Sequence, residues 1–430
     1  MTLDWLRRLK RFFRAPATIV GGLLAIAVLG ALGAALPQAG VATAAETAHL
    51  RAHGPFLSAL VDGLALDHVF TSPAFLASLG VSTVSLCIVV VEQAGRLRSQ
   101  WGLVLSEGHF RTAPFRQEFL RPARQESAPS TRIRTRGRLS LAGSPLFHAG
   151  LLCVILAGGL RALFGAEAVV DLIEGETLPA SVEAWGVQWP GPLGRPFSLD
   201  APLVLESIES SRYSAGDLLG LRIGFSIQRP GHEQRLELGV NEELRTRGGR
   251  IYLDAMHGPA ALVEWVVPTF APIRSAILLE RKEAKAFGAY AHGPRRLLAR
   301  IRAPEPASGM RPGAVEIRIL DGSAAIGEGT LKPGEALAFG GGGSLRLHGL
   351  PYWVRLHGNH DPALGLAYLG FALALLGATL IFAVVKVDEL VSVSLEGDAE
   401  RVVVALRPGR FAPLFKDRFE RLLREQGGQP

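Results

Sequence analysis

One ionisable side chain lies inside an apolar run long enough to begin a membrane span. His148 ends the segment Gly143-Ser-Pro-Leu-Phe-His148 and is followed by the apolar residues 149–160. A titratable group in hydrocarbon is costly, so it usually has a partner or a function. Neutral imidazole is also a common ligand of haem iron. His148 is therefore a candidate axial ligand of haem iron. The alternative is an interfacial histidine hydrogen-bonded to a neighbouring helix.

The other chemistry-bearing residues favour ordinary structural roles. His357 and His360 form a His-x-x-His pattern beside Asp361, but positions i and i+3 of an extended strand face opposite ways. His49, His53 and His68 form a similar scattered group, for which solvated positions are expected. We find no motif of serine hydrolases, HExxH metalloenzymes, P-loop enzymes or dinucleotide-binding enzymes. The sequence leaves open whether the chain is an enzyme by itself.

Cysteine usage excludes several further classes. The two cysteines, Cys87 and Cys153, both lie in apolar runs. The long segment 165–361 therefore forms no disulfide. Because Cys-x-x-Cys and Cys-x-x-Cys-His are absent, the chain is neither a thioredoxin-like reductase nor a c-type cytochrome.

The apolar residues concentrate in four runs that approach the length needed to cross a bilayer, about 20 residues. We predict a membrane protein with four transmembrane helices and a large, mostly β extracytoplasmic domain. The predicted ranges are a basic N-terminus (1–14), the first span (15–36), a periplasmic loop (37–72), the second span (73–91), a cytoplasmic Arg-rich loop (92–143), the third span (144–164), a periplasmic β-rich domain (165–361), the fourth span (362–385) and a cytoplasmic tail (386–430). The first run is also compatible with a signal peptide cleaved near residues 41–45.

Basic residues predict the orientation of these spans. Residues 93–143 hold ten arginines against three glutamates, whereas residues 38–72 hold only Arg51 among basic residues. By the positive-inside rule, both termini and the Arg-rich loop lie in the cytoplasm of a cell with an inner (plasma) membrane. The net charge of +7 is explained by these segments, so no nucleic-acid partner is expected. Residues 3–14 alternate apolar and basic side chains, as in a helix lying on an anionic leaflet.

Local patterns predict the structure outside the membrane. Residues 165–361 contain many short β-rich stretches separated by turn signals, which favour an antiparallel sandwich or barrel-like domain. In the tail, residues 391–395 and 402–406 predict a hairpin, and residues 415–423 predict a helix. The Arg-rich residues 111–138 are expected to be the least ordered part.

Several short motifs, taken in order, resemble the ResB-like proteins of cytochrome c biogenesis System II. The matching segments are Gly30-Ala-Leu-Gly-Ala-Ala-Leu-Pro-Gln38, Ser72-Pro-Ala-Phe75, Ser85-Leu-Cys87, Gly143-Ser-Pro-Leu-Phe-His148, Phe164-Gly165, Val170-Asp-Leu-Ile-Glu-Gly-Glu176, Asp361-Pro362 and Tyr368-Leu-Gly-Phe371. The resemblance is concentrated around the spans and weak across residues 177–345.

The resemblance implies a function in haem export and cytochrome c assembly. Members of the family act with a CcsA/ResC-type membrane subunit, and the complex acts as a cytochrome c synthetase that presents haem b to apocytochrome c. A thioredoxin-like reductase contributes indirectly by keeping the apocytochrome reduced. The resemblance places the shared haem ligand at His148. The alternative from another functional class is a membrane-anchored scaffold whose β-rich outer domain holds a partner without a role in haem handling.

Overall fold

The computed structural model describes residues 2–38, 59, 61–63, 65–123, 128–212, 218–229, 231–268, 270–282, 285–292, 297–303 and 312–429. The candidate cleavage segment 41–45 and two of the histidines, His49 and His53, lie outside these residues. The chain forms two compact units. The membrane unit comprises residues 1–38, 44–162 and 363–430, and the β-rich unit comprises residues 39–43 and 163–362.

Four helices of the described chain are long and apolar enough to cross a membrane. They are α2 (Pro16–Ala35), α5 (Pro73–Trp101), α6 (Ser140–Phe164) and α7 (Leu364–Ala383). Proline at the first turn of α2 and α5 suits a helix start, where its missing N–H would have no helical partner. Together with the large mostly-β segment, these helices confirm the predicted fold class, and the chain is a membrane protein.

The N-terminal residues form the expected amphipathic helix. Helix α1 (Thr2–Arg14) is tied to α5 by two cations that approach Glu92. The guanidinium of Arg14 lies 3.1 Å from the Glu92 carboxylate, and the Lys10 ammonium lies 3.8 Å from it. The exposed aromatic rings of Trp5 and Phe12 remain available on α1.

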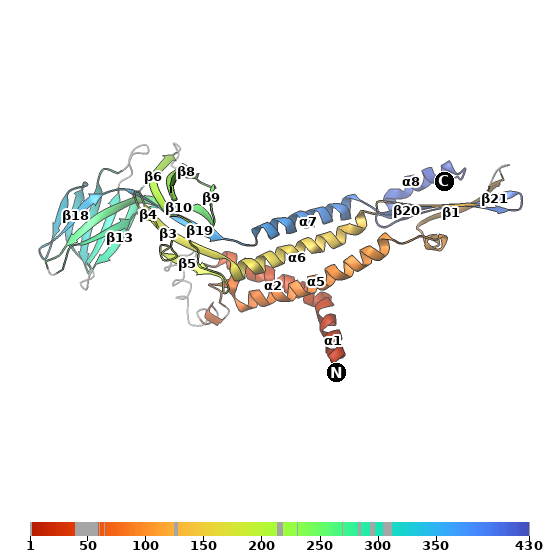
Figure 1. The fold of residues 1–430 in the computed structure, drawn as a ribbon, viewed down its shortest axis with the longest axis horizontal. Helices are drawn as coiled ribbons and strands as arrows, with labels where there is room; N and C mark the ends of the chain where they lie inside the picture. The colour runs from red at the N-terminus through yellow and green to blue at the C-terminus, as the bar shows by residue number, and fades with distance from the viewer. Residues whose placement is uncertain are drawn as a thin grey trace. The chain divides into compact units, whose positions relative to one another are not determined.

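Helices α6 and α7 are antiparallel and meet through glycine. Gly143 and Gly150 of α6 face Gly377 and Gly370 of α7, two helical turns apart on each helix. A Cβ atom on Gly150 would lie 2.5 Å from the Gly370 carbonyl oxygen, and one on Gly377 would lie 2.7 Å from the Gly143 carbonyl oxygen. The two backbones are therefore in direct contact, as small residues allow between membrane helices (Figure 1).

The turn between α2 and α5 is fixed by polar side chains. Gln38 donates to the carbonyl oxygen of Leu66 at 3.0 Å and accepts from the amide of Val69 at 3.1 Å. Ser72 caps α5 by accepting from the amide of Phe75 at 3.2 Å. The Pro-Gln and Ser-Pro-Ala-Phe motifs thus meet in one buried corner.

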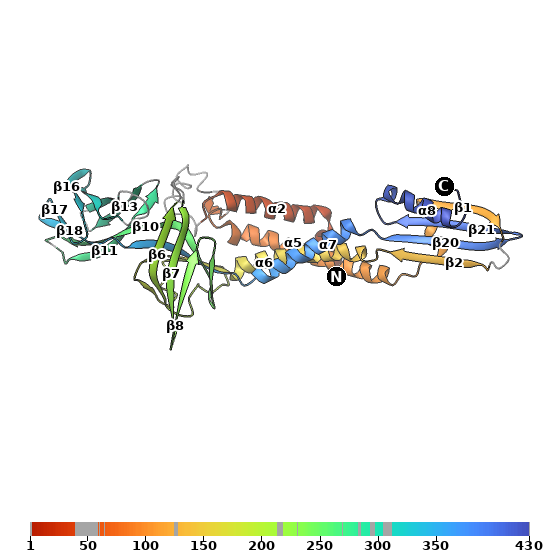
Figure 2. The ribbon, with the colours of Figure 1, turned by 90° about the horizontal axis from the view of Figure 1, so that it is seen from above.

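A four-stranded antiparallel sheet forms from segments far apart in the sequence. Its order is β1 (Phe115–Pro122), β21 (Ala399–Pro408), β20 (Val387–Glu396) and β2 (Ser130–Arg136), and α8 (Lys416–Glu425) packs on it (Figure 2). The predicted tail hairpin and helix are confirmed. The expectation of low order in residues 111–138 is wrong for β1 and β2. Their charged side chains alternate with Phe115, Phe119 and Ile133, which face the inner side.

The β-rich unit contains three antiparallel sheets. The 8-stranded sheet has the path β17-β18-β10-β19-β3-β5, with β9 and β11 also paired to β10; a 4-stranded sheet has the order β4-β6-β7-β8; and a 5-stranded sheet has the order β12-β13-β14-β15-β16. The strands are β3 (Ala166–Ile173), β4 (Thr177–Leu178), β5 (Val187–Pro190), β6 (Leu203–Arg212), β7 (Leu218–Arg229), β8 (His232–Gly239), β9 (Glu243–Thr246), β10 (Gly249–Val266), β11 (Ile273–Leu278), β12 (Glu280–Lys282), β13 (Lys285–His292), β14 (Leu297–Ala303), β15 (Val315–Asp321), β16 (Ala324–Leu331), β17 (Ala336–Phe339), β18 (Gly343–Gly349) and β19 (Tyr352–His360).

The described strands enclose two large hydrophobic cores and a smaller buried cluster of Ile173, Ala260 and Trp353, whereas the sequence predicted one antiparallel sandwich or barrel-like domain. One core contains Phe225 and Ile251, and the other contains Trp265 and Ile317. The 18-residue strand β10 contributes to both cores, and its register against β19 shifts between Leu253 and His257. A single long strand therefore connects two packed halves.

Candidate functional site

The ring of His148 is oriented by its own helix. His148 lies about two turns from the start of α6, and its Nδ1 atom is 2.8 Å from the carbonyl oxygen of Ser144. A carbonyl oxygen only accepts, so Nδ1 carries the proton and donates it. The lone pair then resides on Nε2. A backbone carbonyl on the second ring nitrogen is the usual way in which proteins orient a metal-binding histidine.

Helix α5 supplies the next neighbour of the ring. The Nε2 atom of Gln93 lies 3.3 Å from His148 Nδ1, and the Phe147 ring meets the imidazole edge-on at 5.6 Å. Since Nδ1 donates to Ser144, the Gln93 amide is compatible with this tautomer when its oxygen faces the ring. The imidazole is half-buried.

A cavity of about 400 Å³ lies beside this histidine. Its walls come from α5, α6 and α7 and from Arg410, which lies two residues after the end of β21. The lining residues are Gln93, Arg96, Leu97, Gln100, Ser140, Leu141, Ser144, Pro145, Ile381 and Arg410. Gln93 and Ser144 both contact the His148 ring and both line the cavity. The cavity therefore lies next to the Nδ1 side of the ring, and His148 is not itself among its lining residues.

The small residues after His148 divide into two groups. Gly150 contacts the backbone of α7, so it allows the two helices to pack closely. Gly158 and Gly159 have no atom within 4 Å of an added Cβ atom. These two positions leave open space on the helix surface at the opposite end of α6.

Three histidines in the last part of the β-rich unit have structural partners. His357 donates from Nε2 to Asp254 at 2.6 Å, and His360 donates from Nδ1 to the carbonyl oxygen of Gly248 at 3.0 Å. His348 lies 3.2 Å from the Glu264 carboxylate. Within the described residues, no group of three or more His, Cys, Asp and Glu side chains is arranged to hold a metal ion.

The contact between His357 and Asp254 gives a pH-dependent prediction. The hydrogen bond from His357 is the main cause that lowers the pKa of the Asp254 carboxyl. Because the folded pKa lies below the unfolded pKa, the stabilisation is present above the unfolded value and is lost as the pH falls through the folded one. In a soluble fragment of residues 165–361, Asp254→Asn should lower the free energy of unfolding by about 1–2 kcal/mol at neutral pH.

The difference between this variant and the unsubstituted fragment should shrink in acid, as measured by urea unfolding at a series of pH values. Asp321→Asn, at an exposed carboxylate, is the matched control and should have little effect. Equal stability of Asp254→Asn and the unsubstituted fragment at neutral pH would contradict the prediction.

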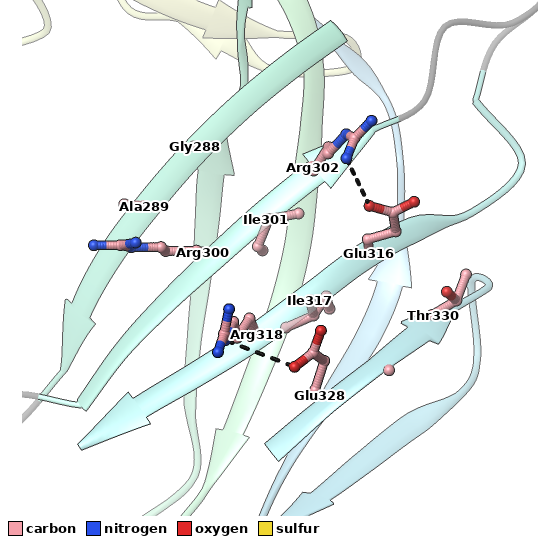
Figure 3. Close-up of a pocket in the computed structure, with 11 residues that line it drawn as sticks. Gly288, Ala289, Arg300, Ile301, Arg302, Glu316, Ile317, Arg318, Glu328 and Thr330 are labelled. Atoms are coloured by element: carbon pink, nitrogen blue, oxygen red, sulfur yellow. Dashed lines mark ion pairs between the residues drawn. The ribbon is translucent and has the colours of Figure 1, made fainter. Parts of the chain in front are cut away.

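A larger cavity, of about 810 Å³, lies on the second half of the β-rich unit, over strands β13 to β16. Its charged residues are partly paired across neighbouring strands: Arg302 lies 3.5 Å from Glu316, and Arg318 lies 3.6 Å from Glu328 (Figure 3). Its lining residues include neither histidine nor cysteine. This cavity therefore offers no nitrogen or sulfur ligand for haem iron.

Comparison with known proteins supports the resemblance noted in the sequence. The model of the ResB-like family matches residues 18–135, which extend from α2 into β2. The predicted resemblance to this family is confirmed. The chain is also 24% identical over 434 residues to the cytochrome c biogenesis protein CcsB of Synechococcus sp. (strain CC9605), with 91% of each chain covered. Gln93 lies inside the family match, and His148 lies beyond it.

Several residues of the family-like motifs have architectural roles that the sequence did not reveal. Gln38 and Ser72 fix the turn between α2 and α5, as described above. Glu174 accepts from the amides of Ile208 at 2.8 Å and Tyr352 at 3.0 Å, and so joins three strands. Among the motif residues, His148 has a ring that contacts two residues lining a cavity in the membrane unit, Gln93 and Ser144.

Proposed function

We propose that this chain is a subunit of a membrane complex that exports haem and delivers it to apocytochrome c outside the membrane. It acts with a CcsA/ResC-type haem-handling subunit, and a thioredoxin-like reductase acts indirectly on the apocytochrome. Haem b is a transient cargo shared between the two membrane subunits. His148 supplies one axial ligand to its iron.

The observation that carries this proposal is the 2.8 Å contact between His148 Nδ1 and the carbonyl oxygen of Ser144. Its Nδ1 proton is donated to Ser144, so Nε2 retains the lone pair that an iron ligand needs. The ring is half-buried beside a cavity in the part of the membrane unit that carries the Arg-rich loop. The CcsB-like relative, by its name, supports cytochrome c biogenesis as the process.

Haem copurification tests the function. Full-length protein produced with its CcsA/ResC-type partner should carry haem with a low-spin absorption spectrum typical of two imidazole ligands. A complex that assembles cytochrome c normally but carries no haem at any stage would favour the scaffold alternative.

The orientation of the spans follows from charge and from the four-stranded sheet. Strands β1 and β2 belong to the loop between α5 and α6, whereas β20 and β21 follow α7. Segments in one sheet must share a compartment, and the arginine excess favours the cytoplasm as that compartment. We infer that both termini are cytoplasmic and that the β-rich unit lies in the periplasm.

Labelling of single cysteines tests this orientation. We expect Lys332→Cys, on the exposed surface of the β-rich unit, to react with a membrane-impermeant maleimide in intact spheroplasts. Arg132→Cys and Glu396→Cys, on exposed positions of β2 and β20, should react only after permeabilisation. The parent for all three variants has Cys87 and Cys153 replaced by alanine. Labelling of Arg132→Cys in intact spheroplasts would overturn the four-span topology.

A further inference from the structure

The cavity of about 400 Å³ between α5, α6 and α7 combines apolar walls with two cationic residues. The apolar lining residues are Leu97, Leu141, Pro145 and Ile381. The cations are Arg96 and Arg410, and no carboxylate belongs to the lining. Among the ion pairs of the described residues, none includes either of these arginines, whereas Arg121 and Arg418 of the same unit each contact a glutamate. The membrane unit therefore leaves two positive charges at this cavity without a carboxylate of its own.

The lining residues lie where the helices leave the membrane. Hydrocarbon about 30 Å thick takes about 20 helical residues, and on α5 a count from Pro73 reaches that number near Glu92. Arg96 lies about one turn farther along α5, at the level of the lipid headgroups. Ile381 lies in the last turn of α7, and Ser140 lies in the first turn of α6. Apolar walls and cations therefore meet at the boundary between acyl chains and headgroups.

The N-terminal helix α1 independently marks the same level. Its exposed surface carries the aromatic rings of Trp5 and Phe12 together with basic side chains, and such a helix lies in the interface beside anionic headgroups. Arg14 holds α1 against Glu92 of α5 at 3.1 Å. Glu92 is four residues before Arg96, so the two lie about 6 Å apart along the axis of α5. The cavity is thus at the depth of the headgroups that α1 is expected to contact.

We propose that this cavity binds the phosphate of an anionic phospholipid of the cytoplasmic leaflet, with Arg96 and Arg410 as its cationic partners. Guanidinium groups bind phosphate through paired, charge-assisted hydrogen bonds, and basic pockets between membrane helices suit such headgroups. Pro145 and Ile381 provide apolar surface at the level where the acyl chains begin. A small soluble anion would use the arginines but would leave this apolar surface without a partner. Binding of this lipid does not depend on haem at His148, so it goes beyond the proposed function.

Native mass spectrometry of the full-length chain tests this proposal, with phosphatidylglycerol and phosphatidylcholine of the same acyl chains as probes. The two lipids then differ only in the headgroup and its net charge. The wild-type chain should bind phosphatidylglycerol at least about tenfold more tightly than phosphatidylcholine. The double variant Arg96→Gln/Arg410→Gln should reduce that preference to about twofold or less. Arg96→Lys/Arg410→Lys keeps both charges but not the paired geometry, so its preference should lie between these two values.

Arg11→Gln/Arg98→Gln is the charge-matched control, because it removes two positive charges from exposed positions of α1 and α5 that do not line the cavity. It should keep a preference close to that of the wild-type chain. Equal loss in both glutamine variants would assign the preference to diffuse surface charge and overturn the proposal. Equal binding of the two lipids by the wild-type chain would overturn it without any variant. Excess inorganic phosphate should not displace the lipid; displacement would assign the arginines to a soluble anion and also overturn the proposal.

Discussion

Replacing Gly150 by leucine is expected to prevent α6 and α7 from packing. An added Cβ atom would lie 2.5 Å from the Gly370 carbonyl oxygen, which is backbone and cannot rotate away. Membrane helices associate through close packing rather than hydrophobic burial, so separated backbones lose most of that attraction. Overpacking of this kind costs about 1–3 kcal/mol or more. We expect a strongly lowered melting temperature in detergent and a loss of folded protein from the membrane of about fivefold at 1 kcal/mol and about a hundredfold at 3 kcal/mol.

Gly158→Leu is the matched control for this prediction. It introduces the same side chain into the same helix, at a position with nothing within 4 Å. We expect it to leave the melting temperature and the membrane level nearly unchanged. Equal thermal stability of the Gly150 and Gly158 variants would show that the glycine contact between α6 and α7 is not needed for folding.

His148→Ala is expected to abolish cytochrome c assembly while the protein still inserts and folds. A methyl group has no lone pair for iron, whereas alanine is well tolerated in a membrane helix. We expect the level of mature cytochrome c to fall at least about tenfold. Added imidazole should restore part of the activity, because it supplies the missing donor without the tether. Covalently bound haem in membrane extracts measures the assembled cytochrome.

His360→Ala is the control for loss of a histidine elsewhere. It removes the hydrogen bond to the Gly248 carbonyl oxygen in the β-rich unit, so the effect on cytochrome c should be mild. Normal cytochrome c levels in His148→Ala would mean that the residue serves helix packing, and the scaffold alternative would then gain weight.

The transmembrane part of the fold was predictable because its signal is local. A run of about 20 apolar residues identifies a span without knowledge of its neighbours. The partition of residues 165–361 into two cores was not predictable in this way. It depends on which strands pair with the two halves of β10, and β19 pairs with that strand from about one hundred residues away in sequence. The period-2 pattern identifies strands but does not identify their partners.

The four-stranded sheet was missed for a related reason. Strands β1 and β21 pair Phe115 with Leu406 and Phe119 with Val402 across most of the chain length. In the sequence, the arginines of this loop dominate its composition, which is typical of unstructured, solvated segments. The alternation of Phe115 and Phe119 with charged residues was the sequence signal for a strand. It identifies β1 only once β21 is known to pair with it.

Only part of the candidate site could be predicted from the sequence. His148 stood out because an ionisable residue in an apolar run is unusual. Arg96 and Arg410 did not, because arginines near span ends have a sufficient explanation in the positive-inside rule. Their placement in one cavity with Ser144 and Gln93 depends on how three helices and the end of β21 come together.

Exchange of the axial ligand tests most directly whether His148 binds haem iron. The measurement compares haem in the purified full-length wild-type complex with haem in the His148→Cys complex. Electron paramagnetic resonance and absorption spectra are recorded for both. If His148 is the ligand, wild-type haem should be low-spin with two imidazoles, and the variant should show the spectrum of a thiolate-ligated or five-coordinate haem. Haem bound in equal amount with an unchanged bis-imidazole spectrum in His148→Cys would contradict the assignment, because a residue that does not touch the iron cannot alter its ligand field.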